Sequence, residues 1–475
     1  MKKRWQVFGA IYSAGMIGIS AVLMAGCGTK EVEKNANTGK KVEEKSVQTD
    51  DESTTEKVKN NGSYMVTVGD SVYFRDYPVA SIDSVTIGEE NMGHLVDGAS
   101  SYISCYDKIS GNVTQVAEDV YGGLLFYGNG SIYTNRRSDD ETTTYGKISL
   151  EDGVVKELGE GTICGISQDG SLLAIEQREK NETKQLLIID TKNQQQVTAI
   201  EKENSTVHYI SFYENSVVYE LEERILYDKE VDEKVSSVSD YYAVYHVYQQ
   251  DLDNGSVLSL GTITFPFMED SEAESVEIDN GNVTIGCERE PGFTQGIISG
   301  NRVGVSYQVA EGTGAVFEYG YIASATLGEE NSLDGVEYIE NTSKEEEKDT
   351  ESYEPMPKIW FDQNQKLQYG KHQPGSAYIS GDTLFYMNEN GEEQEVVKEY
   401  AKGRDMVDTS EGEIVDYADS FSVVQNVIYA VREKIERDEK NDFGWRAAYK
   451  LHELEYCKIN IADGTVEIFQ VEKAK

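Results

Sequence analysis

Short apolar runs recur along the chain from Gly62 onward, and a turn pair introduces nearly every run. Gly381-Asp382 precedes the apolar run 384–387, and Asn390-Gly391 then turns the chain into a return segment ending at 396–397. Gly, Asn and Asp tolerate the positive φ angles of tight hairpin turns, so this pattern predicts short β-strands joined by hairpins. Six further runs have the same character, at 71–77, 131–137, 171–177, 216–222, 282–288 and 426–432.

A second signature follows most of these runs: a strand that ends in a turn and then resumes. In the segment 457–469, Cys457, Ile459 and Ile461 share one face before Asp463-Gly464. This period-two alternation predicts a half-buried hairpin. Similar segments occur at 105–116, 146–158, 186–200 and 248–260. Together the two signatures make a four-stranded unit that repeats at roughly 40 to 60 residues, the spacing of a β-propeller blade.

The chain is therefore predicted to be all-β, a β-propeller of roughly six to eight blades. A tandem β-sandwich is the alternative, because short strands and turns serve both folds. A solute-binding protein of the α/β type would alternate strands with amphipathic helices, and no such alternation occurs. Only the segment 431–442 is compatible with a short helix, and a charged hairpin loop fits it equally well.

The first 26 residues have the order of a secretory signal peptide. Basic residues at 2–4 come first, a mostly apolar run follows at 7–22, and small residues precede Cys27. The motif Met24-Ala25-Gly26-Cys27 resembles the lipobox of bacterial lipoproteins, with Met24 where leucine is usual. This resemblance implies cleavage before Cys27 and lipidation of its thiol, which would place the protein on the extracytoplasmic face of the cell membrane. The alternative is an uncleaved transmembrane helix, since the run is nearly long enough to span a bilayer.

Composition divides the rest of the chain at Gly62. Residues 28–61 are rich in Lys, Glu, Thr, Asn and Ser and almost lack large apolar residues, so they cannot bury enough surface to fold. We predict a lipidated cysteine and disordered tether over 27–61, with ends about 30 Å apart, and a propeller domain over 62–475. The acidic segment 341–357 is interpreted as a solvated loop inserted in that domain.

The charge balance limits the possible partners. Removal of residues 1–26 would leave 40 basic against 86 acidic residues, a formal charge of −46. So acidic a chain is not expected to bind nucleic acid or anionic lipid through basic patches. Its remaining cysteines, Cys105, Cys164, Cys287 and Cys457, lie far apart without a CxxC motif. They are expected to be small buried residues rather than zinc ligands, with disulfide bonds between them as the alternative.

The stretch "GDTLFYMN" and hairpins such as "INIADGTVEIF" resemble the blades of TolB-like and low-density-lipoprotein-receptor-like β-propeller lipoproteins of Gram-positive bacteria. Those blades read as a turn, two apolar residues, Tyr, and then a strand ending in Asp-x-x-Gly. The resemblance covers most of residues 62–471 and loses its register over 290–373. It implies a propeller domain of unknown function on a lipoprotein.

Motifs for catalysis or metal binding are absent from the sequence. The segment 165–169, "GISQD", departs from the nucleophile elbow GxSxG at its last position, and neither HExxH nor a phosphate-binding GxxxxGK[ST] motif occurs. The five histidines show no pair at metal-ligand spacing. Asp251 and Asp253 begin like a calcium loop, but the Asn254-Gly255 turn accounts for them. We therefore expect no cofactor and no metal, and we assign no catalytic residue.

Aromatic residues near expected loops are the remaining lead, because Tyr and Trp are enriched at protein interfaces and stack on sugar rings. The candidates are Tyr241, Tyr242, Tyr245, Tyr248, Phe443 and Trp445. The hypothesis is a non-catalytic, membrane-anchored lipoprotein whose propeller binds a protein partner or a cell-envelope glycan. Two alternatives stay open: a polysaccharide-acting propeller enzyme, a glycosidase or lyase that uses paired carboxylates, and a lipoprotein that supports assembly of a membrane complex.

Overall fold

The structure is a computed structural model that describes residues 58–76, 85–86, 101–119, 122–137, 143–179, 182–226, 241–266, 276–287, 289, 291–311, 316–340, 357–402, 414–437 and 448–473. Every regular element among these residues is a β-strand or an isolated bridge. Over the same residues, no helix has the length and apolar character that crossing a membrane requires.

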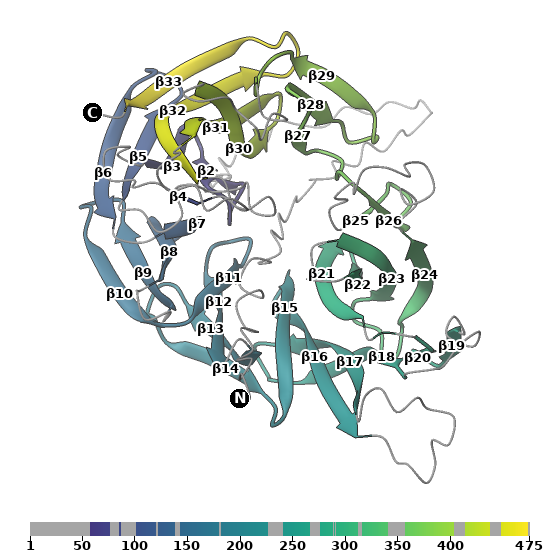
Figure 1. Ribbon diagram of the computed structural model, residues 1–475. Helices are drawn as coiled ribbons and strands as arrows, with labels where there is room; N and C mark the ends of the chain where they lie inside the picture. The colour runs from purple at the N-terminus through teal and green to yellow at the C-terminus, as the bar shows by residue number, and fades with distance from the viewer. Residues whose placement is uncertain are drawn as a thin grey trace, which may run out of the picture.

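The described strands form eight sheets around a central axis (Figure 1), and we number them blades 1–8 along the chain. Blade 1 contains β1 (Val58–Lys59), β2 (Met65–Val68), β3 (Ser71–Asp76), β5 (Ser101–Asp107) and β6 (Val113–Asp119). Blade 2 contains β7 (Gly122–Gly128), β8 (Ser131–Arg137), β9 (Thr143–Ser149) and β10 (Val155–Glu160). Blade 3 contains β11 (Thr162–Ile166), β12 (Leu172–Glu179), β13 (Glu182–Asp190) and β14 (Gln196–Glu201).

Blade 4 contains β15 (Ser205–Tyr213), β16 (Ser216–Leu226), β17 (Tyr241–Asp251), β18 (Val257–Phe265) and the added hairpin β19 (Val276–Asp279) and β20 (Asn282–Ile285). Blade 5 contains β21 (Gly292–Ser299), β22 (Arg302–Glu311), β23 (Val316–Thr326) and β24 (Asp334–Glu340). Blades 6 and 7 are smaller, with β25 (Lys358–Phe361) and β26 (Leu367–Gly370), and with β27 (Ala377–Ser380), β28 (Thr383–Met387) and β29 (Glu393–Val397). Blade 8 contains β30 (Ile414–Val424), β31 (Val427–Arg437), β32 (Ala448–Asn460) and β33 (Val466–Lys473), and β4 (Val85–Thr86) pairs with β32.

This architecture confirms the predicted β-propeller. Each blade is built from strands that follow one another along the chain, and most blades pack on a neighbour at each side rather than on a single facing sheet. A tandem sandwich would instead pair sheets two by two. The segment that was compatible with a short helix is strand β31 as far as Arg437, and residues 438–442 lie outside the described residues.

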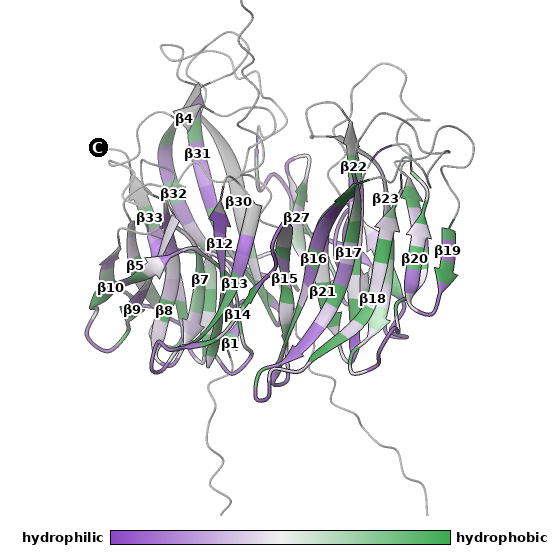
Figure 2. Ribbon diagram, turned by 90° about the horizontal axis from the view of Figure 1, so that it is seen from below, coloured by the Kyte–Doolittle hydropathy of each residue, from purple (hydrophilic) through white to green (hydrophobic). Residues whose placement is uncertain are grey.

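The connections differ between the two edges of the ring. First strands join second strands, and third strands join fourth strands, through short turns at one edge, which we call the tight-turn edge (bottom of Figure 2). The turn at Asn129-Gly130, for example, has φ angles of 47° and 68°. Second and third strands meet at the opposite edge, which we call the long-connection edge. There 14 residues, 227–240, separate β16 from β17.

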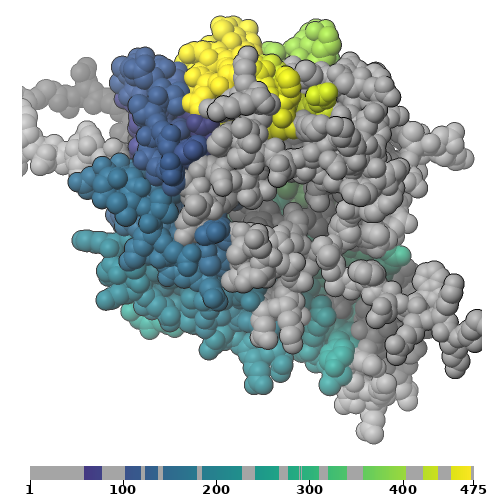
Figure 3. All heavy atoms as spheres, turned by 60° about the vertical axis from the view of Figure 1, so that its left-hand side comes forward, coloured from purple at the N-terminus to yellow at the C-terminus, as the bar shows by residue number. Residues whose placement is uncertain are grey.

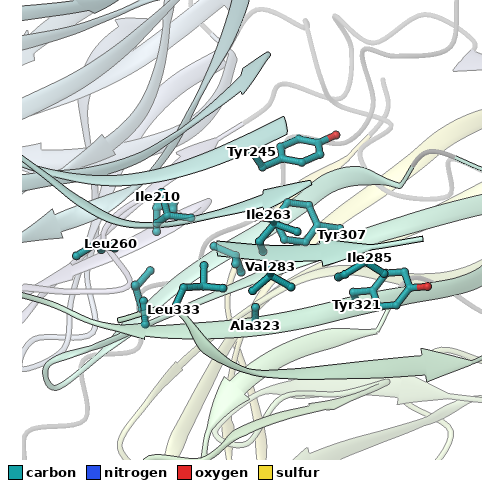
Figure 4. Packing of buried hydrophobic residues seen from close by; sticks show 14 of the residues in the cluster. Ile210, Tyr245, Leu260, Ile263, Val283, Ile285, Tyr307, Tyr321, Ala323 and Leu333 are labelled. Carbon is teal, nitrogen blue, oxygen red and sulfur yellow. The ribbon is translucent and has the colours of Figure 1, made fainter. Parts of the chain in front are cut away.

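The hydrophobic core is divided among the junctions between blades. Alternate residues of a strand face opposite neighbours, so Val217 packs toward blade 3 whereas Val218 packs toward blade 5. The largest cluster among the described residues lies between blades 4 and 5; it contains Phe265 as well as Tyr245 and Tyr307, which are labelled in Figure 4. Each junction buries its own apolar area, and burial contributes about 25 cal/mol per Å². The junctions therefore contribute separately to the stability of the ring.

The ring closes where blade 8 meets blade 1, and β4, from the connection between β3 and β5 of blade 1, pairs with β32 of blade 8. Aromatic residues of both blades pack together there, with the Phe74 and Tyr456 rings 4.8 Å apart and the Tyr106 and Phe469 rings stacked at 4.4 Å. Atoms from the two ends of the described chain lie side by side at this junction in the space-filling view (Figure 3). Side-chain packing and the pairing of β4 with β32 therefore hold the two ends of the ring together.

An N-terminal strap, residues 58–63, reinforces this closure from the axis side of β2. Asn60 Nδ2 donates a hydrogen bond to the carbonyl of Val423 in blade 8 at 3.2 Å. The Asn61 side chain makes two hydrogen bonds with the backbone of Tyr127 in blade 2, at 2.6 and 2.9 Å. Val58 and Lys59 pair with β2, ahead of the composition boundary at Gly62. The strap thus connects blades 8, 1 and 2.

Candidate functional site

In blades 1, 4 and 8, the strand that follows the first tight turn changes from apolar to charged residues along its length. β3, β16 and β31 begin with apolar residues at the tight-turn edge and become charged toward the long-connection edge. The charged ends are Arg75-Asp76 in blade 1, residues 220–224 in blade 4 and residues 432–434 in blade 8. Burying a charge between blades costs free energy unless the charge is paired or hydrogen-bonded. These three strand ends are therefore candidates for a functional site.

The charged end of β3 makes contacts within blade 1 and with both neighbouring blades. Arg75 is 2% exposed and donates to the Gly123 carbonyl at 3.3 Å and to Thr134 Oγ1 at 2.6 Å, both in blade 2. Asp76 accepts hydrogen bonds from the side chains of Ser104 and Gln470. Burial raises the pKa of Asp76 above its ordinary value, although both hydrogen bonds oppose this effect. These groups hold neighbouring blades in place.

The charged end of β31 forms an ion-pair network within blade 8. Arg432 pairs with Glu455, and Lys434 Nζ lies 2.6 Å from Glu455 Oε1 and 3.0 Å from Glu453 Oε2. The Arg432 guanidinium also lies over the Tyr400 ring, 5.2 Å from its centroid. The four charged side chains thus pair with one another, which indicates a structural network rather than a binding site.

Blade 4 combines a buried acid with an exposed end. Glu220 has no exposed surface, and its carboxylate accepts a hydrogen bond from the Tyr307 hydroxyl of blade 5. Its second oxygen, Oε1, has no partner among the described residues. Burial raises the pKa of Glu220 well above its ordinary value and the nearby Glu222 charge adds to this effect, whereas the hydrogen bond from Tyr307 opposes it.

Glu222 lies two residues further along the same face of β16, about 7 Å from Glu220 along the strand. It pairs with His208 Nε2 at 3.2 Å and with Arg224 Nε at 3.5 Å. Burial favours the protonated form of Glu222, but its bonds to these two partners outweigh burial and lower its pKa. The two carboxyls thus have opposite pKa shifts, as a general acid and base would.

The end of the β16–β17 ladder is apolar and exposed. Leu226 lies opposite Tyr241, and Ile225 lies opposite Tyr242. Leu226, Tyr241 and Ile225 are 62%, 44% and 38% exposed, and we call these three residues the apolar tip. Glu222 and Glu223 lie just below it, and Glu223 pairs with Lys202 and with His246. An apolar centre above a charged rim is the usual anatomy of a protein interface.

The aromatic residues that the sequence analysis named as candidates differ in how far they are buried. Tyr241 is exposed at the apolar tip, and Tyr242 is half-buried beside it. Tyr245 is 1% exposed and donates its hydroxyl to the Pro291 carbonyl, so it is a core residue of the junction between blades 4 and 5. Tyr248 is half-buried against the Tyr219 ring. Phe443 and Trp445 lie outside the described residues.

The period-two pattern does not distinguish Tyr241 from Tyr245, because position along the ladder decides which of them is covered. Tyr245 shares a face with Tyr241 but lies four residues further into the ladder, where a neighbouring blade covers it. Leu226 and Ile225 were missed because the run at 216–222 stops short of them. The sequence feature that identifies them is an apolar pair directly after the charged residues 222–224, where a solvated loop would be expected to begin.

The other candidate residues have structural surroundings. Cys105, Cys164, Cys287 and Cys457 are free thiols, and burial raises the pKa of Cys457 to about 12. The Asp251 carboxylate accepts hydrogen bonds from the backbone N–H groups of Asp253 and Asn254, at 2.9 and 3.0 Å, and so stabilises the turn before β18. No group of three or more His, Cys, Asp or Glu side chains suited to a metal occurs within the described ranges.

Comparison with known proteins finds similar folds but no family. No protein-family model and no curated protein matches the chain. Among solved structures, the β-propeller domain of the Trilobed protease from Pyrococcus furiosus is 13% identical, with a TM-score of 0.35 over 86% of this chain and 98% of that one. A putative 6-phosphogluconolactonase from Bacteroides fragilis is 10% identical, with a TM-score of 0.32 over 81% and 97% of the two chains.

TolB from Acinetobacter baumannii is 9% identical, with a TM-score of 0.27 over 78% of this chain and 62% of that one. TM-scores this low carry no argument about activity or substrate. The assignment of the fold rests on the sheets and blade junctions described above.

Proposed function

We propose that this protein is a non-catalytic, lipid-anchored binding propeller that contacts a protein partner through the apolar tip of blade 4. The observation that carries the proposal is the exposure of Leu226, Tyr241 and Ile225 at the end of a rigid ladder, above paired charges. Residues of this kind supply most of the free energy of association where they form the centre of an interface. Tyr241 would also stack on a sugar ring, so an envelope glycan is the second kind of ligand.

The lipid anchor is the other half of the proposal and rests on the motif that ends at Cys27. Acyl chains contribute about 0.8 kcal/mol per buried methylene, and two or more chains give stable anchoring. A Cys27→Ser variant is expected to be released from membranes that retain the parent chain. Metabolic labelling with a fatty-acid probe, followed by membrane fractionation, tests this expectation.

A polysaccharide-acting enzyme is the alternative function, and the opposite pKa shifts of Glu220 and Glu222 are the observation in its favour. Against it, Glu220 has no exposed surface and is engaged with Tyr307, so a glycosidic oxygen does not reach it without separation of the blades. Product analysis with polysaccharide substrates separates the two functions, because turnover that is lost in Glu220→Gln would favour the enzyme.

The binding proposal is tested with variants at matched exposed positions. Leu226→Asp places a charge at the apolar tip, whereas Ile109→Asp does the same at the tight-turn edge, where Ile109 is 80% exposed. Pull-down from membranes, quantified by mass spectrometry against the parent chain, should lose its partner at least tenfold for Leu226→Asp and not for Ile109→Asp. Equal recovery of all partners by both variants would refute binding at the tip.

A further inference from the structure

The strap shows where the chain enters the propeller. In β1, Val58 pairs with Val68, the last residue of β2 before the tight turn at Gly69-Asp70. Lys59 pairs with Thr67, one position further from that turn. The chain therefore enters at the tight-turn edge and runs from there into the ring. Figure 2 places β1 at this edge, level with the turns.

Contacts with other blades agree on this position. Asn60 reaches Val423, next to the turn that joins β30 to β31, and Asn61 reaches Tyr127, next to the turn that joins β7 to β8. Gly62 then donates to the Leu125 carbonyl at 2.9 Å, two residues further from the turn. Because β1 lies on the axis side of β2, the entry point is close to the centre of the ring and not at its rim.

We propose that the strap orients the propeller, so that the tight-turn edge faces the membrane and the apolar tip of blade 4 faces away from it. This inference rests on the proposed anchor at Cys27. The composition of residues 28–57 predicts a flexible coil, whose ends would lie about 30 Å apart. The β16 strand has 11 residues and so spans about 35 Å from the tight turns to the apolar tip. For the apolar tip to face the membrane instead, the tether would have to run from the centre of the ring to its rim and then along the height of blade 4.

The tight-turn edge is rich in exposed acidic residues, which oppose its docking on anionic lipid. Exposed acidic residues occur in turns of several blades, namely Asp70, Asp152, Asp253, Glu329, Glu330 and Asp463. Anionic lipid headgroups repel such a surface. The tether would therefore hold this edge near the membrane without docking it on the lipid, and the partner would approach the apolar tip from the side of the cell exterior or wall.

Energy transfer within one blade tests the orientation. The full lipidated chain is reconstituted in phosphatidylcholine vesicles that carry an acceptor dye on their headgroups, and a donor dye is attached at Asp253→Cys or at Leu226→Cys. Both positions are exposed and lie at opposite ends of blade 4. Transfer from position 253 is expected to be at least twofold more efficient than transfer from position 226. The parent chain, treated with the same dye, measures labelling of Cys105 and Cys164.

The outcomes separate the orientation from the anchor. Equal transfer from both positions, or greater transfer from 226, in a chain that floats with the vesicles would overturn the orientation and leave the anchor intact. A chain that fails to float would overturn the anchor and the orientation together. A variant with 60 Gly and Ser residues added to the tether should float normally and lose the twofold difference, because its coil is about 50 Å across.

Discussion

Two junctions of the ring are held together by different kinds of contact. Blades 4 and 5 are joined by the chain itself, and their interface combines a large aromatic core with the buried acid Glu220. Blades 8 and 1 hold the two ends of the propeller and have no such connection. There the strap, the aromatic cluster around Phe74, the Asp76–Gln470 hydrogen bond and the β4–β32 pairing connect the two blades.

Both junctions contain a buried acid, Glu220 between blades 4 and 5 and Asp76 between blades 8 and 1, and burial raises the pKa of each. The junctions differ in connection, because covalent continuity limits local separation of blades 4 and 5. The closing junction has only non-covalent contacts, and any loss of these contacts allows the ring to open. We therefore expect the two junctions to respond differently to comparable changes.

The largest effect is expected from removal of the strap. A chain that begins at Tyr64 lacks six hydrogen bonds that the strap makes with blades 2 and 8. At about 1 kcal/mol each, their loss should lower the free energy of unfolding by roughly 6 kcal/mol relative to a chain that begins at Val58. Urea denaturation measures this difference. Equal midpoints for the two chains would show that the strap does not close the ring.

Truncation of one aromatic side chain at each junction sharpens the comparison. Phe74→Ala and Phe265→Ala each remove a fully buried ring and should each lower the free energy of unfolding by about 3–5 kcal/mol. Hydrogen exchange should differ: Phe74→Ala exposes amides of β2 and β30 by local opening, whereas Phe265→Ala accelerates exchange through global unfolding. Identical exchange patterns would remove the distinction between the two junctions.

A smaller, pH-dependent effect is expected from Glu220→Gln. The pKa of Glu220 is raised in the folded state, so above a pH of about 4.5 the unfolded chain releases this proton and the folded chain retains it. Stability then falls with rising pH by at most about 1.4 kcal/mol per pH unit. The variant should therefore gain stability over the parent as the pH rises above about 5 and show little difference at pH 4. Thermal unfolding across this range, with Glu222→Gln as the control, measures the effect.

The smallest effect on folding is expected at the apolar tip. Leu226 is mostly exposed, so Leu226→Asp should change the free energy of unfolding by less than about 0.5 kcal/mol. Unfolding in urea provides the measurement. A destabilisation above 2 kcal/mol would mean that the tip is packed in the folded protein, and loss of a partner by this variant would then no longer indicate a binding surface.

Much of the fold could be predicted from period-two alternation and turn chemistry. The run at 216–222 became β16 and the hairpin at 457–469 became the β32–β33 turn, because Asp, Asn and Gly at turns and alternating apolar residues act locally. The candidate site was less predictable. Tyr241 and Tyr245 belong to one segment with the same composition, yet one is exposed and the other is in the core.

The sequence alone thus determined the strands, their turns, the repeat and the candidate anchor at Cys27, since each depends on residues that are close along the chain. The tertiary structure decided which blades meet, which tyrosines are covered, and that residues 58–63 close the ring. Asn60 contacts a residue 363 positions away, and local sequence has no means of encoding such a distance. These features arise only when the blades pack, because packing places side chains from opposite ends of the chain in contact.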